Sequence, residues 1–276
     1  MKKFLKGLMV SILAVAFLAG CGAKEPASTA PANRLEKIIA DGKLTISTSP
    51  DYPPYEFMDP SKTGQDAIVG ADIDFAKYIA EQLGVTLVIE AMSFDAALAA
   101  VQEGKVDLCI SGLAYKEDRA KAMQLTDNYN LASYQGIMIP ASKADELKAA
   151  EDFTGLLIGA QNGSLQYENV EKQLPEAKIE VVASLSDGIL MLQSGKIEAL
   201  AMSGTSGEQY AKNYDDITMS EFHFEMTNTG TCVGVMNGEK ELFDKVNEII
   251  ADVNAKGLYS QWQEAALELS SEISAK

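Results

Sequence analysis

The sequence predicts an α/β protein made of two α/β lobes. Segments rich in β-branched and apolar residues alternate with amphipathic segments, which is the pattern of βαβ units. One short pattern also occurs twice, because VQEGKVDLCISG at residues 101–112 returns as LQSGKIEALAMSG at residues 192–204. The chain has 276 residues, 47% of them hydrophobic, which suffices for one or two packed domains. The repeat therefore indicates two similar units in one chain.

The first unit is predicted to contain three strands and two helices. The strands are expected at 43–48, 86–92 and 106–111, and the helices at 72–84 and 94–104. Apolar residues recur along one face of the first helix, and Gly84 ends it. Ser93 can cap the second helix, which Gly104 ends. Since strands and helices alternate, we expect parallel strands with right-handed crossovers.

The second unit repeats this order, and helices complete the chain. Its strands are expected at 156–161, 178–183 and 197–203, and its helices at 165–174 and 186–195. Two further helices are expected at 240–257 and 258–272. The first of them carries apolar residues along one face.

Each copy of the repeat ends a helix and begins a strand. Gly104 and Gly195 stand where a left-handed residue ends a helix, and the lysine after each stands where cations are favoured. Shared geometry alone explains these Gly-Lys pairs. The Ser111-Gly112 and Ser203-Gly204 pairs instead follow strands at their carboxyl ends, where ligands of open α/β sheets bind. We therefore expect both Ser-Gly ends to face one cleft.

Composition and motifs favour a binding protein. The formal net charge is −17 and no Lys/Arg cluster lies in the predicted folded part, which argues against a nucleic-acid partner. The chain has no P-loop, G-x-S-x-G, H-E-x-x-H or EF-hand pattern. Its one histidine, His223, makes a His/Cys zinc site improbable and is predicted to be a structural surface residue. We expect no cofactor, no metal and no catalytic residue.

The N-terminal residues predict export and anchoring. Residues 1–20 contain three lysines and an apolar run shorter than the about 20 residues of a transmembrane helix. They end before Cys21 in LAGC, which resembles the bacterial lipobox, whose cysteine is lipidated; an ordinary signal peptide is the alternative. Residues 21–33, rich in Ala, Pro, Ser and Thr, predict a flexible tether. We expect a protein anchored through Cys21 on the extracytoplasmic face of a bacterial membrane.

Two further cysteines, Cys109 and Cys232, lie in apolar stretches that predict strands. Buried free thiols are the usual state of such residues, and a disulfide is the alternative in an exported protein. Their spacing fits no metal-binding motif.

Seven separated segments keep a common order and spacing over nearly everything after residue 34. They are SPDYPPYEF (49–57), VGADIDFAKYIAEQLG (69–84), MSFDAALAAVQEGKVDLCISG (92–112), KEDRA (116–120), LTDNY (125–129), GAQNGSLQYE (159–168) and LFDKVNEIIADVNAKGLYSQW (242–262). Together they resemble the family 3 extracellular solute-binding proteins, the polar amino-acid receptors of ABC importers.

The resemblance implies a fold and a partner. The fold would be the two-lobed type II periplasmic-binding-protein fold, with two crossover segments between the lobes. Lobe 1 would comprise residues 34–131 plus 231–276, and lobe 2 residues 132–230. The strand after the second crossover would place Cys232 beside the strand of Cys109. The protein would be a monomer that delivers an amino acid, or a related small carboxylate, to an ABC permease.

The resemblance also implies which residues contact the ligand. Arg119 would bind the ligand carboxylate with its planar guanidinium, the alternative being a surface arginine paired with Glu117 or Asp118. Tyr52 would stack on the ligand side chain, and Phe94 would form another wall of the pocket. For both rings, packing within the protein is the alternative.

Further contacts would come from small residues. Ser111 and Gly112 would offer hydroxyl and backbone groups, and Ala114 would line the same wall. Ser164 precedes a predicted helix whose N–H groups suit a carboxylate, and it can cap that helix as well. Ser203 would complete the site.

Four positions depart from the family pattern. The receptors usually have Asp where Ser203 stands, to hold the ligand ammonium, and Ser or Thr where Ala114 stands. They often have Thr at the place of Leu165, and receptors for cationic or amide side chains often have Asp at that of Ser49. A buried ammonium without an anionic partner would be costly. Either neutral groups hold it, Asp51 or another acid replaces the missing one, or the ligand has no α-ammonium.

We expect an apolar, aromatic or sulfur-containing amino acid, or a derivative, rather than Lys, Arg or His. Two other functions stay open. An enzyme similar to cyclohexadienyl dehydratases would need a carboxylic acid in the cleft, for which Asp51 is the candidate. A surface sensor or adhesin is compatible with the anchor, although no feature requires it.

Overall fold

The computed structural model describes residues 31–226 and 230–274, and Pro31–Lys276 forms one compact unit. The predicted export signal, Cys21 and the tether up to residue 30 lie outside the described residues. Within the described ranges, no helix is both long enough and apolar enough to span a membrane. The first helix is α1 (Arg34–Asp41), and its N-cap Asn33 accepts a hydrogen bond from the Glu36 N–H. The last residue of the predicted tether is therefore part of a helix cap.

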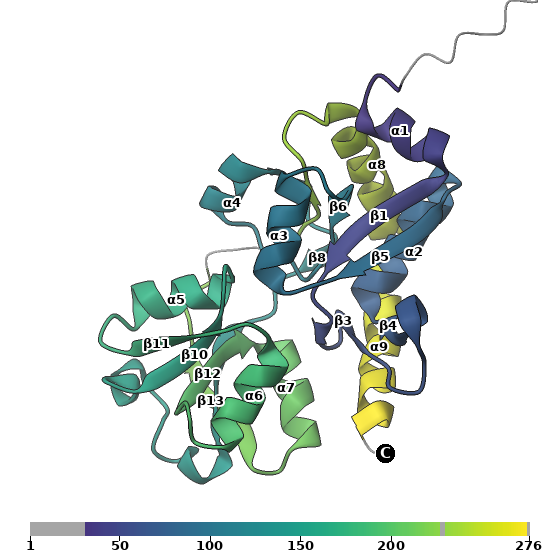
Figure 1. Ribbon diagram of the computed structural model, residues 1–276. Coiled ribbons are helices and arrows are strands. Elements are labelled where there is room, and N and C mark those ends of the chain that lie inside the picture. The colour runs from purple at the N-terminus through teal and green to yellow at the C-terminus, as the bar shows by residue number, and fades with distance from the viewer. Residues whose placement is uncertain (1–30, 227–229, 275–276) are drawn as a thin grey trace, which may run out of the picture. The chain divides into compact units, whose positions relative to one another are not determined.

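The first sheet has the strand order β5-β1-β6-β15-β7 (Figure 1). Strand β1 is parallel to β5 and β6, and β15 is antiparallel to β6 and β7. The strands are β1 Lys43–Thr48, β5 Thr86–Ala91, β6 Leu108–Cys109, β7 Gln124–Leu125 and β15 Gly234–Val235. The helices are α2 Ala71–Leu83, α3 Phe94–Gln102, α4 Glu117–Ala122, α8 Lys240–Lys256 and α9 Leu258–Ser274. Residues of α2, α8 and α9 form one core on this sheet, and residues of α3 form a second core with Cys109 and Cys232.

The second sheet has the strand order β11-β10-β12-β9-β13. Strand β10 is parallel to β11 and β12, whereas β9 is antiparallel to β12 and β13. The strands are β9 Gln135–Pro140, β10 Leu157–Gln161, β11 Lys178–Val182, β12 Ala199–Ser203 and β13 Ile217–His223. The helices are α5 Leu165–Gln173, α6 Leu185–Gln193 and α7 Gly204–Asn213. Val170 of α5 and Ile189 of α6 belong to two different cores of this sheet.

The chain passes between the two sheets twice. Strands β8 (Asn130–Leu131) and β14 (Gly230–Thr231) pair antiparallel at these passages. The predicted lobe boundaries, 131/132 and 230/231, fall at this pair; that the two parts act as separate lobes stays a prediction. A small antiparallel sheet of β2 (Asp51–Tyr52), β3 (Glu56–Met58) and β4 (Ile68–Val69) adjoins the first sheet. Short 3₁₀ helices occupy Gly64–Ala67, Ala141–Lys143 and Ala150–Phe153.

The predicted elements are present in the predicted order. Gly84, Gly104 and Gly195 have φ angles of 69°, 67° and 69°, as expected of residues that end helices. The strand predicted at 106–111 is shorter, because only Leu108–Cys109 pairs as β6. The Arg34 guanidinium binds the Val106 carbonyl at 2.8 Å, so this carbonyl has a side-chain partner.

Cys109 and Cys232 both have free thiols and are fully buried. Cys109 lies on β6 opposite Gly234, and Cys232 lies two residues before the start of β15. The disulfide alternative is therefore absent from this structure, and burial raises the pKa of Cys109 to about 11.

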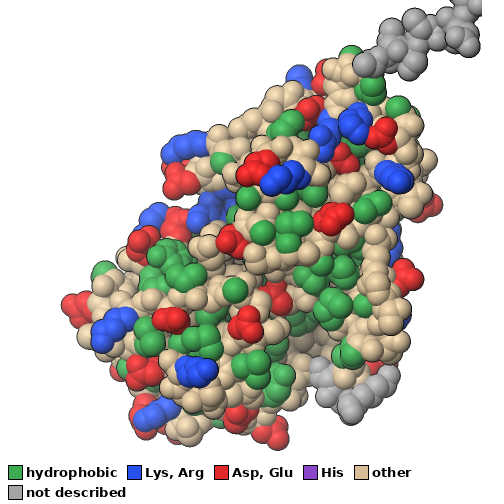
Figure 2. Space-filling view, viewed as in Figure 1, with side chains coloured by type: hydrophobic (Ala, Val, Ile, Leu, Met, Phe, Trp, Pro, Cys, Tyr) green, Lys and Arg blue, Asp and Glu red, His purple; other side chains and the backbone are tan. Residues whose placement is uncertain are grey.

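Acidic and basic side chains are interspersed over the face shown in Figure 2. Many of the ion pairs lie within one helix at exposed positions, such as Lys37–Asp41 of α1 and Lys240–Asp244 of α8. Pairs of this kind contribute little to stability, about 0.3–0.5 kcal/mol each.

Candidate functional site

A pocket lies between the two sheets, and both contribute residues to its lining. It takes in ≈ 660 Å³ of space outside the protein atoms, part of it open to solvent. The predicted ligand-contact residues all line it: Tyr52, Phe94, Ser111, Gly112, Ala114, Arg119, Ser164 and Ser203. The structure thus brings the predicted positions together, while their contact with a ligand stays a prediction.

Arg119 of α4 is buried, with 6% of its surface exposed. Its guanidinium donates to the carbonyl oxygens of Ala114 and Gly163, the second at 2.9 Å. It also lies 5.5 Å from the centre of the Phe94 ring. The surface alternative does not hold, because Asp118 pairs with Lys121 instead. A guanidinium has five N–H groups, so Arg119 keeps donors for an anion.

Ser164 brings a helix N-terminus to the pocket. It is the N-cap of α5, and its hydroxyl accepts a hydrogen bond from the Tyr167 N–H at 3.0 Å. The other N–H groups of this first turn and the helix dipole favour an anion. Because Gly163, the residue before Ser164, accepts from Arg119, the guanidinium and this helix end lie next to each other.

Tyr52 of β2 packs against a core of each sheet. Its ring also lies on Gly112, where an added Cβ would come within 2.6 Å of the ring. Gly112 has a φ of 54°, which other residues rarely adopt. Phe94 similarly serves both as core and as pocket wall, since it is 8% exposed and packs beside the buried thiols. The rings of Tyr52 and Phe94 therefore pack within the protein and also line the pocket.

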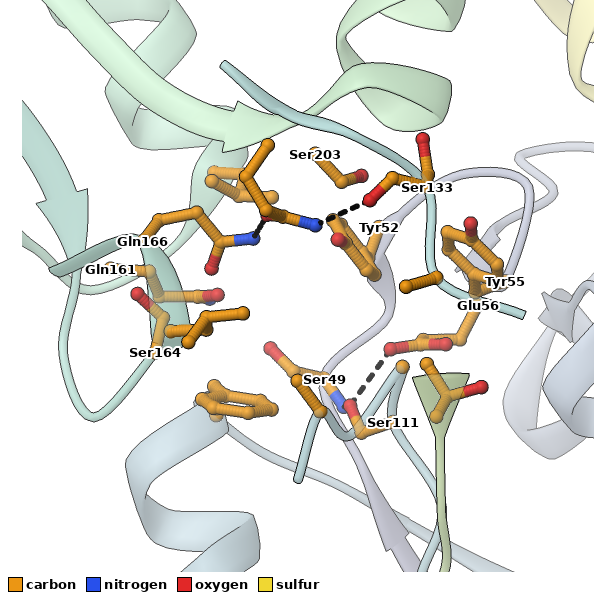
Figure 3. A pocket seen from close by; sticks show the side chains of 18 of the residues that line it. Ser49, Tyr52, Tyr55, Glu56, Ser111, Ser133, Gln161, Ser164, Gln166 and Ser203 are labelled. Atoms are coloured by element: carbon orange, nitrogen blue, oxygen red, sulfur yellow. Dashed lines mark hydrogen bonds between the residues drawn. The ribbon is translucent and has the colours of Figure 1, made fainter. Parts of the chain in front are cut away.

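Ser111 is part of a buried polar network below the pocket. Its hydroxyl donates to Glu56 Oε1 at 2.8 Å and accepts from the Ser49 N–H at 3.0 Å (Figure 3). The Gly112 N–H donates to Asp72 at 2.7 Å. The donors that the sequence assigned to a ligand at Ser111 and Gly112 are therefore used within the protein. Acceptor lone pairs on the Ser111 hydroxyl and the Gly112 carbonyl remain for a ligand.

Asp72 and Glu56 form a buried carboxyl pair, with exposed fractions of 0% and 1%. Asp72 also accepts hydrogen bonds from the hydroxyls of Tyr129 and Tyr259. Burial raises the pKa of both acids, and the charge of Asp72 raises that of Glu56 further, to well above its usual value. Since Asp72 has three donors and Glu56 has one, the proton between the two carboxyl groups resides on Glu56.

An aromatic cluster surrounds Asp72. The rings of Phe75, Tyr129 and Tyr259 pack against one another, with centroid distances of 4.7 Å for Phe75–Tyr129 and 4.9 Å for Tyr129–Tyr259. Trp262 of α9 stacks on Phe75 at 6.3 Å. The cluster connects the carboxyl pair to the C-terminal helix and keeps water from Asp72.

Ser203 is the N-cap of α7 and 2% exposed. Its hydroxyl accepts from the Ser206 N–H at 3.4 Å. The Tyr134 ring covers Gly204, where an added Cβ would come within 2.1 Å of it. Tyr134 in turn stacks on His223 at 4.1 Å, which agrees with a structural role of this exposed histidine. Where the family resemblance implies an acid, the structure therefore has a neutral capping residue.

Asp51 lines the pocket, and both of its carboxylate oxygens accept hydrogen bonds from the protein. One carboxylate oxygen accepts from the Ser49 hydroxyl at 2.9 Å. The other accepts from the Leu185 N–H at 2.5 Å and from Gln161 Nε2 at 3.3 Å. Burial raises the pKa of Asp51, and the Leu185 bond opposes that rise.

Several pocket residues were not predicted from the sequence. They are Tyr55, Glu56, Gln135, Gln161, Gln166 and Thr231. Gln166 donates to Gln135 at 2.6 Å, which joins α5 to β9. One signal existed for Glu56, an acid enclosed between Tyr55 and Phe57 in an apolar segment. No cluster of three or more potential metal ligands occurs among the residues that the structure describes.

The sequence profile of the bacterial extracellular solute-binding proteins, family 3, matches residues 44–267. The chain belongs to this family. Among curated relatives of this family 3 protein, the arginine-binding extracellular protein ArtP of Bacillus subtilis is 28% identical, over 93% of this chain and 94% of ArtP.

Solved structures of similar proteins share the type II periplasmic-binding-protein fold. The substrate-binding protein AbpA of an amino acid ABC transporter from Streptococcus pneumoniae, bound to L-arginine, has a TM-score of 0.80 and 29% identity. The match covers 85% of this family 3 chain and 98% of AbpA. The ancestral amino-acid-binding protein AncCDT-1, a precursor of cyclohexadienyl dehydratase, has a TM-score of 0.75 and 26% identity, over 86% and 100% of the two chains.

Proposed function

We propose that this family 3 protein is an extracytoplasmic receptor that binds an amino acid between its two sheets and delivers it to an ABC permease. The observation that carries the proposal is Arg119, a buried cation without an acidic partner among the described residues. The neighbouring N-terminus of α5 adds further donors for an anion. Together they suit the carboxylate of an amino acid.

The ligand side chain is proposed to be uncharged. In the relatives with arginine in their names, the ligand is cationic. Here Ser49 supplies a hydroxyl, and the carboxylate of Asp51 is occupied by three donors. Tyr52 and Leu185 add apolar surface to the lining. An apolar, aromatic or sulfur-containing side chain fits this lining better than a guanidinium does.

Closure of the two parts around the ligand is proposed to signal occupancy to the permease. Contacts between helices and loops that flank the two different sheets support this, such as Lys116 with Glu168 at 2.9 Å and Asn162 with Asp95 at 2.9 Å.

We further propose a monomer that is held at the membrane by a lipid on Cys21. Replacement of Cys21 by Ala should release the protein from the membrane fraction, and retention there would contradict the anchor.

Binding is favoured over catalysis. An enzyme on this scaffold would need a pocket acid that can transfer a proton to a substrate. Asp51 accepts three hydrogen bonds from the protein, and Glu56 accepts one from Ser111 and has a raised pKa beside Asp72. Neither acid is free to act on a substrate without breaking these bonds.

The proposed function is tested by thermal shift of the chain from Gly22 to Lys276. The ligands are the natural amino acids and L-cystine, each with its α-keto or des-amino analogue. A ligand that binds the folded state adds about 2.7 kcal/mol of stability at 100 times its Kd. We expect a neutral amino acid to raise the melting temperature in the wild type but not in Arg119→Ala. If no amino acid or analogue does so, the receptor function is contradicted.

A further inference from the structure

The pocket contains a buried positive charge and a buried negative charge that do not pair with each other. Arg119 is hydrogen-bonded to carbonyl oxygens. The carboxyl pair of Glu56 and Asp72 is hydrogen-bonded to hydroxyls and one backbone N–H. Within the described ranges, no salt bridge joins either acid to a cation. Each charge is thus taken from water without an ionic partner, which is costly unless a ligand supplies one.

The carboxyl pair carries one negative charge. Two carboxylates in contact repel each other, so one proton is retained between them. Asp72 is held as the anion by Gly112, Tyr129 and Tyr259, and it lies behind Glu56 as seen from the pocket lining, which includes Glu56 but not Asp72. Glu56 is therefore the member of the pair that a ligand can reach.

The other acid in the pocket lining, Asp51, is more fully occupied by the protein than Glu56 is. Asp51 already accepts three hydrogen bonds. Ser203 and Ala114 are neutral. The oxygens of Glu56 each have two lone pairs, so Glu56 can accept from a ligand and still keep its bond from Ser111.

The two charges face different sides of the cavity. In Figure 3, Glu56 and Tyr55 lie opposite Gln161, Ser164 and Gln166. Arg119 is joined to the second group, because it donates to the residue before Ser164. A ligand with a carboxylate toward Ser164 would present its other groups toward Glu56.

We infer that Glu56, backed by Asp72, receives the cationic group of the ligand, so that the receptor selects dipolar ions over simple carboxylates. This inference rests on the proposed function and deepens it. Ser203 stands where the resemblance implies an acid that holds the ligand ammonium. Glu56 of β3, beside the first sheet, would take over this role. A protonated Glu56 would release its proton when the cation arrives, because a neighbouring positive charge favours the carboxylate.

The test is Glu56→Gln, which keeps an oxygen to accept from Ser111 and has nearly the shape of the protonated acid. The matched control is Glu90→Gln, an exposed glutamate of β5. The probes are L-methionine, L-phenylalanine, L-glutamine, L-cystine and L-arginine, each with its des-amino acid, and L-citrulline as the uncharged counterpart of L-arginine. Affinities are measured by titration calorimetry.

Every probe amino acid that binds the wild type should bind Glu56→Gln about 10- to 100-fold more weakly, as expected for a hydrogen bond to a charged group. Its des-amino acid should bind both proteins equally. L-arginine and L-citrulline should be weakened alike, because both carry an α-ammonium; weakening of L-arginine alone would contradict a role of Glu56 in holding the α-ammonium. Glu90→Gln should bind as the wild type does.

Equal weakening of the amino acid and its des-amino acid would assign Glu56 a structural role and overturn the inference, as would unchanged affinity. A second measurement does not depend on the analogues. Binding in buffers of different ionisation enthalpy should show proton release by the wild type but not by Glu56→Gln, at a pH between the ordinary carboxyl pKa and neutrality.

The titratable groups that lie near Glu56 in space are Asp72, Asp51, Tyr52, Tyr55 and Tyr129. All of them stay in Glu56→Gln, so a difference between the two proteins belongs to Glu56 and the carboxyl pair that it forms with Asp72. Proton release that is the same in both would overturn the inference. If no amino acid binds the wild type at all, the proposed function itself fails, and this outcome is distinct from those of Glu56→Gln.

Discussion

The Asp51 carboxylate accepts a hydrogen bond from the Leu185 N–H at 2.5 Å, although the two residues are 134 positions apart. Asp51 belongs to β2 beside the first sheet, and Leu185 begins α6 on the second. The backbone oxygen of Asp51 also accepts from the Tyr210 hydroxyl at 2.9 Å. An anion at a helix N-terminus is favourable, so this contact holds the two parts of the chain together around the pocket.

Replacement of Asp51 by Asn should weaken this closed arrangement. The amide oxygen can still accept from Leu185 and Gln161, but the negative charge that is favourable at the N-terminus of α6 is lost. We expect a larger radius of gyration without ligand in small-angle scattering and about tenfold weaker binding of the amino acid found in the thermal screen. Asp66→Asn, at an exposed position, is the control. An unchanged radius and affinity would assign the Asp51 contact no role in closure.

Replacement of Arg119 by Lys should impair carboxylate binding although the charge is kept. A lysine lacks the planar fork that can bond two carbonyls and a carboxylate together. We expect binding to weaken by at least about 100-fold in calorimetry, which corresponds to about 3 kcal/mol. Lys121→Arg on the exposed side of α4 should bind normally. Binding by Arg119→Lys within a few-fold of the wild type would show that Arg119 is not the carboxylate ligand.

The pH dependence of stability should carry a signature of Glu56. Its pKa in the folded chain lies well above the ordinary value of 4.5, so the folded state binds this proton more tightly than the unfolded state does. The stabilising contribution of Glu56 to the free energy of unfolding should therefore be largest below about pH 4.5. It should fall as the pH rises through the pKa of Glu56 in the folded chain.

This fall should appear in the difference between wild type and Glu56→Gln in urea unfolding without ligand, measured over a series of pH values. Asp51 has a raised pKa in both proteins, and Asp72 interacts directly with Glu56, so the difference reports on the carboxyl pair of Glu56 and Asp72. A difference that is constant with pH, or that rises, would contradict the raised pKa of Glu56.

Gly204 should not tolerate a side chain. An added Cβ would come within 2.1 Å of the Tyr134 ring, so Gly204→Ala forces the ring away from its stacking on His223. We expect a loss of about 1–3 kcal/mol in the free energy of unfolding, as for other overpacked sites. In the double variant with Tyr134→Ala, the additional cost of Gly204→Ala should nearly vanish. If Gly204→Ala lowers the free energy of unfolding equally with and without Tyr134→Ala, the loss comes from the backbone and not from the Tyr134 ring.

The order of helices and strands was predictable from local patterns, because apolar periodicity and glycine positions act over a few residues. The positions of Tyr52, Arg119 and Ser164 around one pocket were predictable only through the family resemblance. The roles of Glu56 and Asp51 were not. Their partners Asp72 and Leu185 are distant in sequence, and whether an acid is buried, paired or free depends on such partners. Likewise, the donors of Ser111 and Gly112 were expected to face a ligand, and the fold uses them internally.

The aromatic cluster around Asp72 connects the pocket to the intrinsic tryptophan fluorescence of the protein. Trp262 is the single tryptophan of the chain, and it contacts Phe75, Tyr78 and Tyr259. The Tyr259 hydroxyl is bonded to Asp72, whose carboxyl partner Glu56 lines the pocket. A change of charge at Glu56 alters the electric field at the indole, so the emission wavelength of the unlabelled protein follows events in the pocket without any added dye.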